Sequence, residues 1–167
     1  MNKQALLWLV PIFITIHNVE EALFMTAMLE ARSAAFPKAL SGWLAPVASS
    51  RQLLIGLLIV TVIPYFVAWK ADLERGLKGR MLLCLQAAMF INVFAHVGMT
   101  IFIGGYAPGI VTALFFNLPF SLYLFIRVRQ AGWVSQGGLL RIGFVGLLLH
   151  ALALPAIILL AGMLVRN

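Results

Sequence analysis

Five apolar stretches, each long enough to cross a lipid bilayer, account for most of this chain. A bilayer core needs about 20 apolar residues for one helical crossing. Lipid offers the backbone no hydrogen-bond partners, so each crossing has to be helical. The pattern predicts an all-α, polytopic membrane helix bundle in a single domain, residues 1–167, with spans at about 5–29, 52–69, 81–103, 110–126 and 139–165.

The composition agrees with lipid as the main solvent. Hydrophobic residues make up 63% of the chain and charged residues 10%, whereas a soluble domain carries about 25% charged residues. The formal net charge of +7 does not indicate a nucleic-acid partner, because the basic residues lie at the ends of apolar runs rather than on one stripe. The expected partners are the lipid bilayer and a lipophilic small molecule or membrane-embedded substrate, and a homo-oligomer is left open.

The Lys and Arg residues are distributed unevenly between the two ends of the predicted spans. With five crossings, eight of them lie on the side of the N-terminus and four on the other side. Because basic residues accumulate on the cytoplasmic side of a membrane, this distribution predicts the N-terminus inside and the C-terminus outside.

Three ionisable residues interrupt the first apolar stretch: His17, Glu20 and Glu21. On insertion scales, such a side chain near the bilayer centre costs about 2.5–3.5 kcal/mol. At 100° per residue, all three fall within an arc of about 100° on one helix face. Two carboxylates this close repel each other, so a proton, a cation or a metal has to compensate for them.

The third apolar stretch carries Asn92 and His96, which share one helix face because they are four residues apart. Counted along the helices, they and the polar group of the first stretch lie at nearly the same depth, about 16–24 Å from the inner surface. Thr112 of the fourth stretch reaches a similar level. We therefore expect one shared site, with the N-terminus of the fourth helix available to a negative substrate group or hydroxide.

These residues form three motifs: HxxEE at 17–21, NxxxH at 92–96 and PGxxT at 108–112. Together and in this order, they resemble the HXXEE-motif family of bacterial membrane proteins of unknown function. The resemblance implies an active site at the three motifs and a location in the bacterial inner (cytoplasmic) membrane. It implies no particular reaction.

Two carboxylates and two imidazoles make a ligand set suited to Zn²⁺, Fe²⁺ or Mn²⁺. The predicted metal ligands are His17, Glu20, Glu21 and His96. The predicted catalytic residues are Glu20, Glu21, Asn92 and Thr112, with one glutamate as general base on a bound water and Asn92 orienting a ligand or donating to an oxyanion. The resulting hypothesis is a metal-dependent, hydrolase-like intramembrane enzyme that acts on a lipophilic substrate.

Three alternatives remain at this point. A metal-free Glu/His acid–base enzyme, isomerase-like, would move protons on a lipid. A proton-coupled transporter or channel component would use the same groups as a relay. The group would otherwise be a hydrogen-bonded cluster that holds helices together. His150, in the fifth stretch, belongs to none of the motifs, and the sequence does not decide its role.

Overall fold

The computed structural model describes residues 3–32, 50–69, 71 and 76–165, and all regular structure within these ranges is helical. The first three helices are α1 (Lys3–Arg32), α3 (Ser50–Ala68) and α4 (Leu77–Ile103). The next is a composite of α5 (Ile110–Thr112), the π-helical η1 (Ala113–Asn117) and α6 (Leu118–Gln130). The last is a composite of α7 (Gln136–Leu148), the π-helical η2 (Leu149–Ala153) and α8 (Leu154–Val165).

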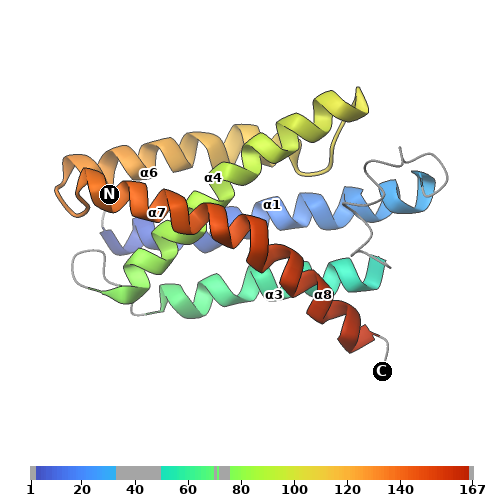
Figure 1. Cartoon of the computed structure of the whole chain (residues 1–167), viewed down its shortest axis with the longest axis horizontal. Coiled ribbons are helices and arrows are strands. Elements are labelled where there is room, and N and C mark those ends of the chain that lie inside the picture. Colours follow the sequence, from blue (N-terminus) through green and yellow to red (C-terminus); the bar gives the residue numbers. More distant parts are fainter. Residues whose placement is uncertain (1–2, 33–49, 70, 72–75, 166–167) are drawn as a thin grey trace.

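Among the described residues, five helical segments are long and apolar enough to cross a membrane, so the predicted all-α bundle with about five crossings is confirmed. Figure 1 shows them lying along one direction, with the beginning of α1 and the end of α8 at opposite ends of the bundle. The fourth crossing continues past the predicted end at 126 to Gln130, and the fifth begins at Gln136 rather than at 139. The protein is a multi-pass membrane protein.

Helix α4 lies at the centre of the bundle and contacts each of the other four crossings. Helix α4 packs tightly against α7 where Ala87 of α4 faces Gly146 of α7. There is no room for a side chain at Gly146, because an added Cβ atom would lie 2.5 Å from the Ala87 Cβ and 2.8 Å from the Ala87 carbonyl carbon. Small residues let helix backbones approach this closely in a membrane, where packing rather than hydrophobic burial holds helices together. Gly146 and Ala87 therefore determine how closely the last crossing packs on α4.

The apolar core occupies the end of the bundle where α1 begins (Figure 1). It comes from the first half of α1, the end of α3, the first half of α4, most of α6 and the start of α7. Its most buried members include Leu7, Val10, Leu82, Leu83 and Leu124. Buried polar side chains of the α1–α4 interface begin beyond this core, at His17.

Each of the last two crossings contains a π-helical turn that ends two residues before a proline. The segment η1 ends at Asn117, before Pro119, and η2 ends at Ala153, before Pro155. Proline lacks the N–H that an α-helix needs and its ring displaces the preceding turn, so a wider turn accommodates it. Both π-helical turns contact α4.

Candidate metal site between α1 and α4

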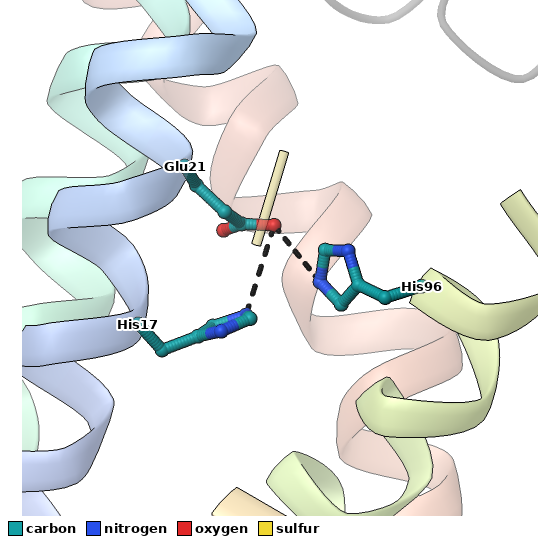
Figure 2. A group of neighbouring side chains, drawn as sticks. All are labelled: His17, Glu21 and His96. Atoms are coloured by element: carbon teal, nitrogen blue, oxygen red, sulfur yellow. Dashed lines mark ion pairs between the residues drawn. The ribbon is translucent and has the colours of Figure 1, made fainter. Parts of the chain in front are cut away.

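Two side chains of α1, His17 and Glu21, point toward His96 of α4 (Figure 2). The Glu21 Oε1 atom lies 3.2 Å from His96 Nε2 and 3.8 Å from His17 Nε2. One ligand atom from each residue lies within 4.8 Å of the others, so this group, among the residues that the structure describes, could hold a metal ion. Both imidazoles are buried, and Glu21 is 18% exposed.

The hydrogen bonds around the two imidazoles determine where their lone pairs point. The Thr112 hydroxyl donates to the Gly109 carbonyl (3.3 Å), so it accepts from His17 Nδ1 (2.9 Å), and this leaves the lone pair of that ring on Nε2. The Asn92 Nδ2 amide is 2.8 Å from His17 Nε2 and 3.0 Å from His96 Nε2. An amide nitrogen only donates, so His17 Nε2 accepts from Asn92. His96 Nε2 lies between the Asn92 amide and Glu21 Oε1, and it donates to the carboxylate when it carries the ring proton. The two Nε2 atoms thus converge beside the Glu21 carboxylate.

Glu20, the neighbour of Glu21, points to different partners. Its carboxylate accepts hydrogen bonds from the backbone N–H groups of Thr112 (2.7 Å) and Val111 (3.2 Å) and from the Tyr106 hydroxyl (2.5 Å). Backbone N–H groups at a helix N-terminus are unpaired within the helix and favour a negative charge. Glu20 thus occupies the N-terminus of α5, the place where the sequence predicted a negative substrate group or hydroxide.

The two carboxylates point to different partners: Glu21 faces the imidazoles, and Glu20 faces the N-terminus of α5. The group that could hold a metal contains three of the four predicted ligands, His17, Glu21 and His96. Glu20 lies outside that group, and its role as a ligand stays a prediction.

The PG turn before α5 brings the backbone against both imidazole rings. Gly109 has φ +89°, a conformation that favours glycine. A Cβ atom there would lie 2.6 Å from His96 Cε1 and 2.9 Å from His17 Cε1. Position 109 of the PGxxT motif therefore requires glycine for two reasons: the backbone is left-handed there, and the two imidazole rings fill the space that a side chain would take.

A pocket of about 500 Å³ opens beside the site and is lined by Glu20, Phe24, Tyr106, Val111 and Thr112. The rings of Phe24 and Tyr106 meet edge to face, with centroids 5.5 Å apart. Burial and the hydrogen bond to Glu20 raise the pKa of the Tyr106 phenol, so it stays a donor. Sequence reasoning missed Tyr106; the signal was a lone aromatic hydroxyl in the uncharged turn just before the PGxxT motif.

The remaining candidates have distinct positions. Asn92 and Thr112 contact the imidazoles directly, as described above. His150 lies in η2, which contacts α4, and its side chain is half-buried. It is not part of the three-residue group.

The fold and the site together define a multi-pass membrane protein with a buried His–Glu–His group beneath the N-terminus of its fourth crossing. The sequence matches the family described as "Protein of unknown function with HXXEE motif" over residues 8–124, and the chain belongs to this HXXEE family. The matched region contains all three motifs and ends before the fifth crossing. No curated protein and no solved structure matches the chain.

Proposed function

We propose that this protein is a metal-dependent enzyme that hydrolyses a lipophilic, membrane-embedded substrate, with a divalent cation held by His17, Glu21 and His96. One observation carries the proposal: the Nε2 atoms of two buried histidines lie beside one carboxylate oxygen. Neutral imidazole nitrogens and a carboxylate are the ligands that Zn²⁺ and Fe²⁺ take in proteins.

The spacing of the donor atoms fits a small divalent cation. Tetrahedral Zn²⁺ with bonds of about 2.0–2.1 Å requires ligand atoms about 3.4 Å apart. The two distances from Glu21 Oε1, 3.2 Å and 3.8 Å, lie on either side of that value, and the whole group lies within 4.8 Å, so the imidazoles would have to draw together around a cation. Thr112 also holds the second ring nitrogen of His17, the kind of outer contact that fixes the tautomer of a metal-binding histidine. Three protein ligands leave a position open, as catalytic sites require.

The chain's own groups have separate tasks in this proposal. A divalent cation would supply Lewis acidity, which polarises a carbonyl group and makes water a better nucleophile. Each Nε2 atom has one lone pair, so Asn92 has to release both rings when the cation binds, and its amide is then free to donate to a substrate oxygen. The second oxygen of Glu21 takes a proton from the attacking water and returns it to the leaving group.

The pocket beside the site supports a lipophilic substrate. Phe24, Tyr106 and Val111 form apolar walls, and about half of each residue is exposed. Thr112 lines the pocket and contacts His17, so the pocket leads to the proposed cation. An acyl or polyprenyl chain is the type of group that such walls would accept from the membrane. With the N-terminus inside, as the basic residues predict, the pocket lies toward the outer leaflet.

Asn92 also favours a second candidate function, the metal-free acid–base enzyme. Its amide occupies both Nε2 lone pairs, so the two rings have partners without any cation. Glu21 and His96, whose Oε1 and Nε2 atoms lie 3.2 Å apart, would then form the acid–base pair that moves a proton on a lipid-like substrate once Asn92 releases His96. The transporter or channel component stays a prediction.

Elemental analysis of the protein purified in nanodiscs separates the first two candidates. The metal proposal predicts about one transition-metal ion per chain in the wild type and none in His17→Ala. Asn18→Ala is the matched control, because Asn18 is the next residue but donates to Thr61 of α3 instead. Metal-free wild-type protein that also takes up no added Zn²⁺ would favour the acid–base enzyme.

The hydrolytic step has its own test. Fluorogenic long-chain esters incorporated into the nanodiscs should be cleaved by metal-loaded protein. A chelator should abolish the cleavage and added Zn²⁺ should restore it. Metal-loaded protein without activity on ester or amide lipids would contradict the hydrolase assignment while leaving the metal site in place.

A further inference from the structure

A second buried polar group lies outside the metal site: Gln86 of α4, Asn117 of η1 and Ser121 of α6, here called the Gln86 cluster. None of the three side chains is exposed. Gln86 Nε2 donates to Ser121 Oγ (2.8 Å), and Ser121 Oγ donates to the Asn117 carbonyl (2.6 Å). The cluster thus joins α4 to the fourth crossing in the middle of the bundle.

Three polar atoms of this cluster have no hydrogen-bond partner among the described residues: Gln86 Oε1, Asn117 Nδ2 and Asn117 Oδ1. An unpaired amide is costly inside a membrane protein, where bulk water does not reach it. Leucine at either position would pack the same space without that cost. Packing therefore does not explain these amides, and their free donor and acceptors point to a ligand.

The chemistry of the unpaired atoms selects that ligand. A cation would satisfy the two oxygens but not the Asn117 Nδ2 group. An anion would satisfy that nitrogen but not the oxygens. A water molecule both donates and accepts, and buried waters in proteins bind such leftover groups with about three hydrogen bonds.

The Gln86 cluster is aligned with the metal site along the fourth crossing. Thr112, Asn117 and Ser121 are all buried, whereas Phe115 and Phe116, between the first two, are exposed on the lipid-facing surface. Thr112 contacts His17, and Asn117 is five residues further on, at most about 7.5 Å along the axis, because the α-helical rise is an upper limit for the wider π-helical turn. This distance is within reach of a short chain of water molecules.

We propose that the Gln86 cluster binds internal water and supplies it to the site formed by His17, Glu21 and His96. The supply role rests on the proposed hydrolysis, which consumes one water molecule for each bond cleaved. The pocket beside Glu20 is a poor route for water because aromatic and aliphatic side chains form its walls. Water and the lipophilic substrate thus reach the site from different directions.

Water-edited solid-state NMR of the protein in bilayers tests this inference without a substrate. Selective ¹⁵N labelling of Asn gives five side-chain amides, and the Asn117→Leu variant identifies one of them. Magnetisation from water should reach the Asn117 amide at least threefold faster than the Asn18 amide, whose nitrogen is bonded to Thr61. Transfer to Asn117 that is no faster than to Asn18 would overturn the water site.

The supply role is tested at Asn92, inside the metal site. In Asn117→Leu, transfer from water to the Asn92 amide should slow at least twofold, while Asn18→Leu should leave it unchanged. Ser121→Ala, a smaller change, should slow it less and covers the case that Asn117→Leu does not fold. Unchanged transfer in both cluster variants would overturn the supply role. Metal content measured on the same samples reports on the proposed function separately.

Discussion

The half of the bundle in which α1 begins and the half that contains His17 and His96 are built from different side chains. In the first half, leucines of α1, α4 and α6 pack together with almost no exposed surface. In the second half, α1 and α4 bring together imidazoles, carboxylates and an amide. These two helices run through both halves, so one pair of helices positions both sets of side chains.

The contrast indicates that different side chains determine the stability of the fold and the binding of a cation. Apolar packing in the first half fixes the helix positions, and the second half uses those positions to hold costly polar groups face to face. Substitutions in the core half should therefore change the free energy of unfolding, and substitutions in the polar half should change cation binding.

The largest expected effect distinguishes the two adjacent glutamates. Glu21→Gln should weaken Zn²⁺ binding by about 100-fold or more, because it removes a charged ligand. Glu20→Gln should weaken it by less than about tenfold, because the hydrogen bonds of Glu20 go to the N-terminus of α5 and to Tyr106 rather than to the cation. Competition with a chelating dye measures both affinities. Equal losses would show that Glu20 is also a ligand, as the sequence predicted.

A substitution in the apolar core should lower the stability of the fold and leave Zn²⁺ binding unchanged. Leu124→Ala should lower the free energy of unfolding by about 2 kcal/mol, since the cavity term remains although lipid is as apolar as the core. Zn²⁺ affinity should stay within twofold of the wild type. Unfolding in mixed micelles and the same dye titration give the two values. A Leu124→Ala protein that keeps its stability but loses Zn²⁺ would break the comparison.

The outer contact on His17 should have a smaller effect. Thr112→Val keeps the side-chain shape and the backbone N–H that Glu20 accepts, but it removes the hydroxyl that holds His17 Nδ1. We expect about tenfold weaker Zn²⁺ binding, at the lower end for such outer contacts. Thr61→Val is the control, since its hydroxyl contacts Asn18 and not an imidazole. Equal losses in both variants would mean a general loss of packing.

The smallest predicted effect has the opposite sign. Asn92→Ala should bind Zn²⁺ up to about tenfold more tightly, because the amide no longer competes for the two Nε2 lone pairs and one net hydrogen bond is worth about 1 kcal/mol. Catalysis should nevertheless fall, since the donor to the substrate oxygen is gone. Calorimetric titration measures the affinity. Weaker binding in Asn92→Ala would make Asn92 a ligand instead of a competitor.

Much of this architecture can be predicted from the sequence because lipid imposes simple rules. Apolar length identifies the five crossings, and counting residues along them predicts that His17, Asn92 and His96 meet at one depth. The three motifs then mark where the chain departs from an apolar pattern. These features depend only on helix geometry and on the cost of polar groups in hydrocarbon.

The positions of Glu20, Tyr106 and Asn117 depend on local backbone conformation, which the periodicity of apolar residues does not predict. The left-handed backbone of Gly109 sets the direction in which α5 begins. In that direction, the N-terminal N–H groups of α5 donate to Glu20 rather than to a ligand. Tyr106 joins the site through the same turn. The π-helical turn before Pro119 determines that Asn117 faces the interior, where it has no partner among the described residues. A straight-helix projection does not place these side chains.

X-ray absorption at the zinc edge, on protein loaded with one equivalent of Zn²⁺ in nanodiscs, identifies the atoms that bind the metal. We expect two imidazole nitrogens and at least one carboxylate oxygen at about 2.0–2.1 Å, with one imidazole lost in His17→Ala. A zinc shell without imidazole scattering, or one unchanged by that substitution, would contradict a metal site between α1 and α4.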